Sequence, residues 1–241
     1  MIGNLFNLIL YQPLFNALIF LYAYLSGHDF GIAIIILTAA IRLALYPLMA
    51  QSIRSQKILN ELQPKIQEIQ KQYKDDKQQQ AKAMMELYQK EKFNPFGGCL
   101  PLLIQLPILL ALYQVFWRGF QAEQLGFLYS FVPSPGVIDP MFLGLINLTQ
   151  PNIVFAILAG IFQFFQSKMM MPQMKKQQRG SDQMAQFSGA MQKQMVYLLP
   201  VFTVFILWKL PAAIGLYWLV TTLFSIIQQY LIYKKPVFKN A

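Results

Sequence analysis

Long apolar stretches alternate with polar, basic connections along most of the 241-residue chain. The clearest is residues 31–49, GIAIIILTAAIRLALYPLM, in which Arg42 is the only charged residue. A helix of this length rises about 1.5 Å per residue and can cross a hydrocarbon core of roughly 30 Å. Further stretches of this kind lie at 99–117, 152–171, 195–208 and 213–233. The pattern therefore predicts five membrane-spanning helices.

These stretches and their connections divide the chain into segments of one all-α integral membrane protein. Five transmembrane helices are joined by an N-terminal interfacial helix and a cytoplasmic helical hairpin. The segments are an outer-leaflet amphipathic helix (1–30), a first span (31–50), the cytoplasmic helical hairpin (51–97), a second span (98–118), an external loop (119–150), a third span (151–171), a cytoplasmic loop (172–194), a fourth span (195–210), a fifth span (211–233) and a basic cytoplasmic tail (234–241).

The N-terminal segment is apolar but carries polar residues on a broad stripe. These residues are Asn4, Asn7, Gln12 and Asn16. Such a stripe is typical of an amphipathic helix that lies on the membrane surface, here the outer leaflet. A sixth span is the alternative, because the length alone permits one. In the external loop, the apolar run Met141–Leu148 is a candidate for the membrane interface.

The region 51–92 is the one extended hydrophilic part of the chain. Apolar residues recur there at helical intervals on both sides of Asp75-Asp76, which predicts an antiparallel helical hairpin. Pro64 predicts a kink or a shorter start in the first arm. The sequence leaves open whether the hairpin is a solvated spacer or a docking arm for a partner. The candidate docking residues are Ile58, Leu62, Ile66, Met84 and Met85.

Composition and charge support membrane insertion and orient the chain. Charged residues make up 12%, against about 25% in an average soluble domain. The net charge is +10, but the first 41 residues and positions 119–150 contain no Lys or Arg, whereas positions 42–92 contain ten. Basic connections favour the cytoplasmic side. We therefore expect a multi-pass protein with its N-terminus outside and its C-terminus in the cytoplasm.

Arg42 is the candidate functional residue of the first span. Arginine near the middle of a membrane helix costs roughly 2.5–3.5 kcal/mol on insertion scales, so its side chain needs water or a polar partner. Thr38 lies four positions earlier on the same helix face. The last span carries a polar stripe that can face Arg42, formed by Tyr217, Thr221, Ser225 and Gln228. The alternative is that the guanidinium snorkels to the nearer interface.

Motifs of conventional enzymes are missing from the sequence. There is no glycine-rich phosphate-binding loop, the single histidine His28 cannot complete a Ser-His-Asp set, and no cluster of metal ligands stands out. The lone Cys99 excludes an internal disulfide. We expect no enzymatic activity, cofactor or metal. A solute transporter stays open, although no internal repeat or intramembrane Asp or Glu supports it, as does a pure assembly chaperone.

Short motifs along the chain carry a family resemblance. They are QPLF at 12–15, LTAAIRLALYPL at 37–48, LQPKIQ at 62–67, DDK at 75–77, NPFGGCLPLLIQLPI at 94–108, FFQSKM at 164–169, LLPVFTVFILW at 198–208 and GLYWLVTTLFSIIQQYLI at 215–232. In this order and spacing they resemble the YidC family of membrane protein insertases over residues 10–233. The chain is similar to the short bacterial forms without a large external domain.

The resemblance implies a protein that inserts, and helps to fold, newly made membrane proteins in the bacterial cell (inner) membrane. A hydrophilic intramembrane groove with one arginine would bind the substrate. The residues implied or expected there are Thr38, Arg42, Gln105, Gln163, Tyr217, Trp218, Thr221 and Ser225. Expected partners are nascent membrane proteins and the lipid bilayer. A ribosome, a targeting-factor receptor and a Sec-type translocon are further candidates, whereas no specific nucleic acid is expected.

Overall fold

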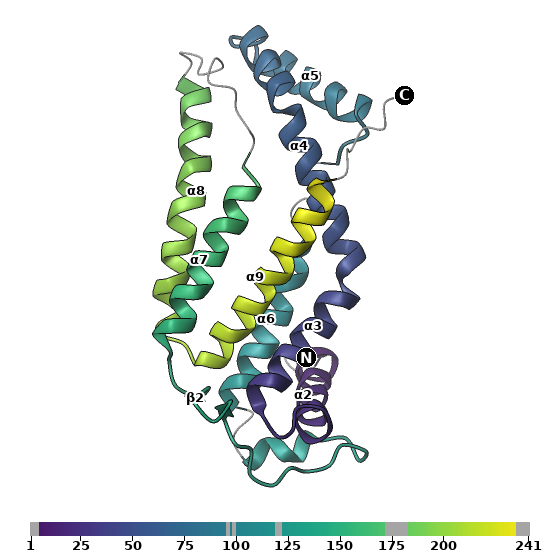
Figure 1. Ribbon diagram of the computed structural model, residues 1–241. Helices are drawn as coiled ribbons and strands as arrows, with labels where there is room; N and C mark the ends of the chain where they lie inside the picture. The colour runs from purple at the N-terminus through teal and green to yellow at the C-terminus, as the bar shows by residue number, and fades with distance from the viewer. Residues whose placement is uncertain (1–4, 95–96, 98–99, 119–121, 172–182, 235–241) are drawn as a thin grey trace.

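The computed structural model describes residues 5–94, 97, 100–118, 122–171 and 183–234, and this part is mostly helical (Figure 1). The helical content agrees with the predicted fold class, from which the two-stranded ribbon β1–β2 is a small departure. Most of the predicted basic tail lies outside the described residues. The elements are η1 (Asn7–Tyr11), α2 (Gln12–Tyr24), α3 (Phe30–Ala44), α4 (Tyr46–Gln72), α5 (Lys77–Lys90), α6 (Leu100–Arg118), η3 (Ala122–Phe127), β1 (Met141–Phe142), β2 (Ile146–Asn147), α7 (Ile153–Met169), α8 (Gln183–Leu207) and α9 (Ala212–Tyr233).

The helices differ in whether their apolar stretches are long enough to cross a membrane. Within the described part of the chain, α9 alone is both long and apolar enough to cross a membrane by itself. Helices α3 and α4 meet the same criterion only when they are taken together across a bend of 65°. Shorter apolar stretches lie in α6, α7 and α8, at Leu103–Trp117, Ile153–Met169 and Val196–Leu207. The number of five spans stays a prediction.

The stretch 31–50 is not one continuous helix, which corrects our expectation. Helix α3 ends at Ala44, and α4 begins at Tyr46 after the shared cap Leu45. Pro47 gives the physical reason, because a proline inside a helix has no N–H group and its ring collides with the carbonyl four residues earlier. The bend turns the chain just after Arg42, and α4 then packs against α9.

Two further boundaries differ from the sequence-based expectations. Helix α4 runs through Pro64 to Gln72, so the shorter start predicted there is wrong. Helix α8 begins at Gln183, which makes 183–194 helical where we expected a cytoplasmic loop. Gln, Met, Ala and Lys are good helix formers, so their abundance in this region is compatible with a helix even though it is not apolar. Residues 172–182 of the expected loop lie outside the described part.

The hydrophobic core lies where α2, α3, α6, α7 and α9 meet. Large side chains from α2, α3 and α6 are fully buried there. Helices α7 and α9 contribute both large buried residues, such as Phe155 and Tyr217, and small ones, such as Ala159 and Ala213. Small residues let helix backbones approach closely. At Gly160 of α7, a Cβ atom would overlap the side chain of Val204 in α8. Close packing of these helices leaves the polar residues described below on one side of α7 and α9.

The polar stripe of the N-terminal helix is partly used inside the protein. Asn16 is buried, donates to the carbonyl oxygen of Phe127 at 3.0 Å and accepts from the backbone N–H of Tyr129 at 2.7 Å. Gln12 also donates to the Phe127 carbonyl, at 3.0 Å. These side chains satisfy backbone groups at the end of η3 and just after it. Part of the stripe that we expect at the membrane surface therefore fastens α2 to the backbone at Phe127 and Tyr129.

Candidate functional site

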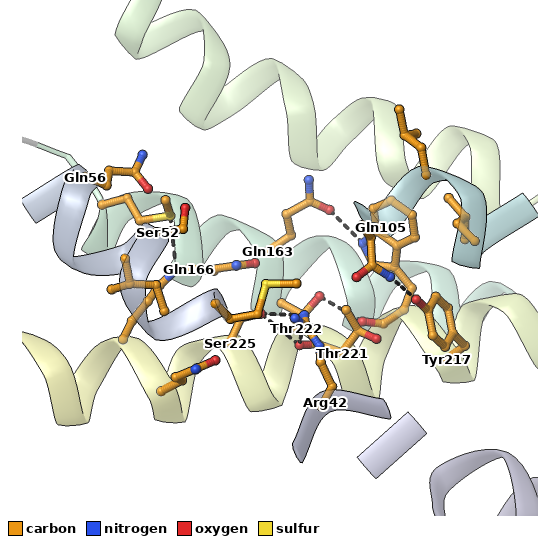
Figure 2. A pocket seen from close by; sticks show the side chains of 18 residues that line it. Arg42, Ser52, Gln56, Gln105, Gln163, Gln166, Tyr217, Thr221, Thr222 and Ser225 are labelled. Carbon is orange, nitrogen blue, oxygen red and sulfur yellow. Dashed lines mark hydrogen bonds between the residues drawn. The ribbon is translucent and has the colours of Figure 1, made fainter. Parts of the chain in front are cut away.

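A cavity of about 400 Å³ lies between α3, α4, α6, α7 and α9 (Figure 2). Hydroxyl and amide groups dominate one part of it, and methionine, leucine and isoleucine side chains complete the walls. A cavity of this size with several polar groups can hold water. The lining residues are Arg42, Met49, Ser52, Ile53, Gln56, Gln105, Leu106, Leu109, Gln163, Gln166, Met170, Tyr217, Trp218, Thr221, Thr222, Ser225, Gln228 and Gln229.

Arg42 reaches the cavity from the last turn of α3 and binds α9 (Figure 2). Its Nη2 donates to the backbone carbonyl oxygen of Thr221 at 2.9 Å and to the hydroxyl oxygen of Ser225 at 2.7 Å. Its Nε is buried and has no hydrogen-bond partner within the described structure. A guanidinium has five N–H donors and suits a carboxylate. Arg42 therefore keeps unused capacity for an anionic group.

The positive charge of Arg42 has no acidic partner within the described chain. The ion pair found among the described residues joins Lys65 and Glu91. Neither residue lines the cavity. Helices α3, α6, α7 and α9 contain no Asp or Glu. An unpaired cation in an environment of reduced dielectric attracts anions more strongly than it would in bulk water. The cavity therefore contains one guanidinium that has no acidic partner among the described residues.

Two amides connect the aromatic residues of α9 to the neighbouring helices. The side-chain amide of Gln105 in α6 donates to the hydroxyl of Tyr217 (Figure 2). The indole Nε1 of Trp218 donates to the side-chain oxygen of Gln163 in α7 at 3.1 Å. Tyr217 and Trp218 of α9 are therefore held by two different walls of the cavity, α6 and α7.

Thr38 is the expected groove residue that the structure does not bring into the cavity. It is buried, and its hydroxyl donates to the carbonyl oxygen of Ile34 in its own helix at 2.6 Å. Threonine in a helix commonly satisfies its hydroxyl in this way. Helical spacing places Thr38 near Arg42, but its hydroxyl is already bound. The other expected groove residues, Arg42, Gln105, Gln163, Tyr217, Trp218, Thr221 and Ser225, all line the cavity.

Helix α4 contributes a wall of the cavity that the sequence pattern does not predict. Met49, Ser52, Ile53 and Gln56 line the cavity and recur at intervals of three, one and three, as one face of a helix does. We had assigned most of them to the start of a cytoplasmic hairpin. The available signal was Pro47, because a bend there redirects the next helix toward the same site. Thr222 and Gln166 also line the cavity.

Most candidate docking residues of α4 and α5 pack against each other. Leu62 and Ile66 of α4 are buried with Phe93, and Ile58 and Met84 are partly buried against them. This contact leaves them unavailable to a partner unless the pair opens. Met85 differs, with 59% of its side chain exposed. An apolar face that packs α4 against α5 cannot bind a partner at the same time. Among the expected docking residues, Met85 is therefore the one that remains accessible in the described structure.

Comparison with known proteins identifies the family of this chain. The family model described as 60Kd inner membrane protein matches residues 20–239. The chain belongs to the 60Kd inner membrane protein family. A relative from Fusobacterium nucleatum subsp. nucleatum is 37% identical over 207 residues, which cover 86% of this chain and 87% of the relative. Its name is membrane protein insertase YidC.

Other relatives of the 60Kd inner membrane protein family are longer. A protein from Geobacter metallireducens, also named membrane protein insertase YidC, is 36% identical over 218 residues, or 90% of this chain and 35% of the relative. One from Shewanella loihica with the same name is 37% identical over 206 residues, or 85% of this chain and 33% of the relative. The chain thus spans about a third of the length of these relatives. The family recognised from the sequence motifs is confirmed.

Proposed function

We propose that this protein is a membrane protein insertase and chaperone of the bacterial cell (inner) membrane, and not an enzyme. The observation that carries the proposal is the state of Arg42. Its side chain lies in a polar cavity among apolar helices, is bound only by uncharged groups in the described structure and keeps Nε without a partner. Charged residues inside membrane helices are expensive and generally mark a function. The names of the relatives, membrane protein insertase YidC, support the same function.

The proposed topology has five spans, with the N-terminus outside and the C-terminus in the cytoplasm. Helices α3, α6, α7, α8 and α9 would cross the membrane, and α4–α5 would be the cytoplasmic hairpin. The distribution of Lys and Arg supports this orientation, since positions 119–150 have none and positions 42–92 have ten. In this frame the cavity would open toward the cytoplasm along α4.

The physical task of an insertase is to move a polar segment of a new protein through hydrocarbon. Each backbone group without a hydrogen bond there costs several kcal/mol. A hydrated cavity partway across the membrane shortens the hydrocarbon path. The polar lining of the cavity would supply hydrogen bonds along this path, and Arg42 would attract acidic residues of the incoming segment.

Binding at Arg42 would proceed by exchange of partners. In the free protein, the Ser225 hydroxyl occupies one donor of the guanidinium at 2.7 Å. A substrate carboxylate carries a full negative charge and can bind the planar guanidinium through two parallel hydrogen bonds, whereas a neutral hydroxyl offers one uncharged acceptor. It would therefore replace Ser225 and also engage Nε. The released Ser225 hydroxyl keeps a partner, because it also donates to the Thr221 carbonyl at 3.0 Å.

The apolar part of the substrate would leave sideways between α6 and α7. Gln105, Leu106 and Leu109 line the cavity from α6, and Gln163 and Gln166 line it from α7. The outer surface of α6 exposes Leu103, Leu106 and Leu110. A substrate helix would slide along this surface into lipid. Burial of its apolar surface and the membrane potential would supply the energy.

The proposed partners are nascent membrane proteins and the lipid bilayer. A ribosome, a targeting-factor receptor or a Sec-type channel would meet the protein at its basic cytoplasmic side. Met85 on α5 is an exposed apolar contact for such a partner. No specific nucleic acid is expected, because the positive charge follows the cytoplasmic connections of the chain.

Reconstitution of the purified full-length chain into liposomes tests the function. A single-span substrate with a short acidic N-terminal tail is synthesised beside these liposomes, and protection of the tail from added protease is measured. We expect protection with the protein and none with protein-free liposomes. Protection that requires an added translocon would indicate a chaperone alone. Solute uptake without protection of the tail would indicate a transporter.

A further inference from the structure

The turn between β1 and β2 exposes two leucines, Leu143 and Leu145, and Leu143 has a backbone conformation that leucine rarely adopts. The strands pair antiparallel, with Met141 opposite Asn147 and Phe142 opposite Ile146. Between them, Leu143 has φ +52° and Gly144 has φ +67°. Leu143 is 59% exposed and Leu145 is 80% exposed. A positive φ at a bulky residue costs free energy, so the surrounding contacts must hold this turn in place.

Asp29 holds the turn against the first residues of α3. Its Oδ1 accepts from the N–H of Ile32 at 2.8 Å and so caps the helix. Its Oδ2 accepts from the N–H of Leu143 at 2.5 Å. Phe142 lies against Gly31, where a Cβ atom would overlap its side chain. One carboxylate therefore binds both the turn and the start of α3, so that the two lie at the same position along the α3 axis.

The same ribbon is fixed to α7 and α9. The N–H of Ala213, in the first turn of α9, donates to the carbonyl oxygen of Leu148 at 3.0 Å, next to β2. The ring of Phe142 lies 6.2 Å from that of Phe155 in α7, centroid to centroid. The ribbon thus joins the N-terminal ends of three helices, and its position along their axes is set by these contacts (Figure 1).

Two of these helices are short for a membrane. Helix α3 has 15 residues and α7 has 17, which correspond to about 22 and 26 Å, less than a hydrocarbon core of roughly 30 Å. Additional apolar surface at their outer ends would make up part of the difference. Leu143 and Leu145 lie at that level, and positions 140–149 carry no charged residue.

We propose that Leu143 and Leu145 insert into the outer leaflet, at the boundary between lipid headgroups and acyl chains. This inference rests on the proposed topology, in which the N-terminal ends of α3, α7 and α9 face outward. The partner is the apolar part of a phospholipid, because the turn offers leucine side chains and no charge for a headgroup. The inserted turn extends the apolar surface of α3 and α7 and keeps their outer ends together on the closed side of the cavity.

An environment-sensitive label tests the insertion. In a Cys99→Ser background, which removes the one native thiol, Leu145→Cys is labelled with NBD in the full chain and reconstituted into phosphatidylglycerol–phosphatidylethanolamine liposomes. We expect its emission to shift to shorter wavelength and to be quenched more by lipids with a nitroxide near the headgroup than by lipids with one at the chain end. Leu143→Cys repeats the measurement if the first variant fails to reconstitute.

Two control positions for the label distinguish failure of the proposed insertion from failure of the proposed topology. Ser134 is an exposed polar residue of the same external segment and should give unshifted emission. Phe205 is 60% exposed on the apolar part of α8 and should give a strong shift. A shift at Phe205→Cys without one at Leu145→Cys would overturn the insertion and leave the membrane topology intact. Emission at Leu145→Cys that moves only when another protein is added would assign the turn to a protein partner instead.

Discussion

Lys57 of α4 donates a hydrogen bond from Nζ to the carbonyl oxygen of Tyr233, the last residue of α9, at 3.1 Å. The same ammonium lies 5.5 Å from the centroid of the Tyr233 ring. One turn further along α4, the Asn60 amide donates to the carbonyl oxygen of Met170, which caps α7, at 2.9 Å. A helix C-terminus has unpaired carbonyls and partial negative charge, so both contacts are favourable. One face of α4 therefore holds the ends of α7 and α9 beside the cavity.

Lys57→Met should loosen this contact while it retains most of the side-chain stem. We expect the free energy of unfolding to fall by about 1 kcal/mol, because a charged donor to a helix end is lost. For a chain of this size that corresponds to a decrease in Tm of about 2–4 °C. Thermal unfolding in detergent measures it. Lys65→Met is the control, since Lys65 forms an exposed ion pair with Glu91 at 2.6 Å and such pairs contribute little. Equal decreases for both variants would contradict the role of Lys57.

Arg42→Ala should reduce insertion of substrates with acidic tails more than insertion of substrates with neutral tails. A charge-assisted hydrogen bond contributes about 1.5–3 kcal/mol, so we expect roughly a 10- to 100-fold loss for the acidic tail. Arg42→Lys should retain most activity if charge alone matters and lose it if the bidentate geometry matters. The liposome assay provides the measurement. Arg54→Ala removes an exposed arginine of α4 and serves as the control. Equal loss for both tails would rule out the attraction by Arg42.

Gln105 and Tyr217 should behave as a coupled pair. Tyr217→Phe leaves the Gln105 amide without its hydroxyl partner, and Gln105→Leu leaves the hydroxyl without the amide. Each single change should lower the free energy of unfolding by about 1–2 kcal/mol, whereas the double variant should cost less than the sum. A double-mutant cycle of thermal unfolding measures the coupling. Strict additivity would show that the bond contributes nothing to stability.

Gly160→Ala should destabilise the contact between α7 and α8. The added Cβ would overlap the Val204 side chain and approach the Pro200 carbonyl oxygen to 3.2 Å. Overpacking of this kind costs about 1–3 kcal/mol. Val204→Ala in the same chain should restore part of the loss, because it removes the overlapping methyl groups. Gly126→Ala is the control, since no atom lies within 4 Å of its added Cβ. Thermal unfolding measures these effects. The Tm should fall for Gly160→Ala, recover in part for the double variant and stay unchanged for Gly126→Ala.

Sequence reasoning succeeded where a local pattern carries the information. The polar stripe Tyr217, Thr221 and Ser225 follows from spacing along one helix, and these residues do line the cavity with Arg42. The hydroxyl of Thr38 binds the Ile34 carbonyl of its own helix. Spacing could not predict this contact, because it identifies a helix face and not the partner that a hydroxyl selects. The seam of α4 and α5 was correctly recognised as apolar, but the sequence alone could not distinguish an internal contact from a docking surface.

The sequence by itself determined that apolar helices dominate this protein, how its basic residues divide between the connections and that Arg42 needs a polar environment. These properties depend on composition and on intervals of three or four residues, so they can be read locally. Only the tertiary structure decided that Arg42 binds the Thr221 carbonyl, 179 positions away, and that α4 turns back to line the cavity. Contacts over such separations depend on the relative orientation of whole helices, which bends such as the one at Leu45 set. The spacing of residues within one helix does not determine that orientation.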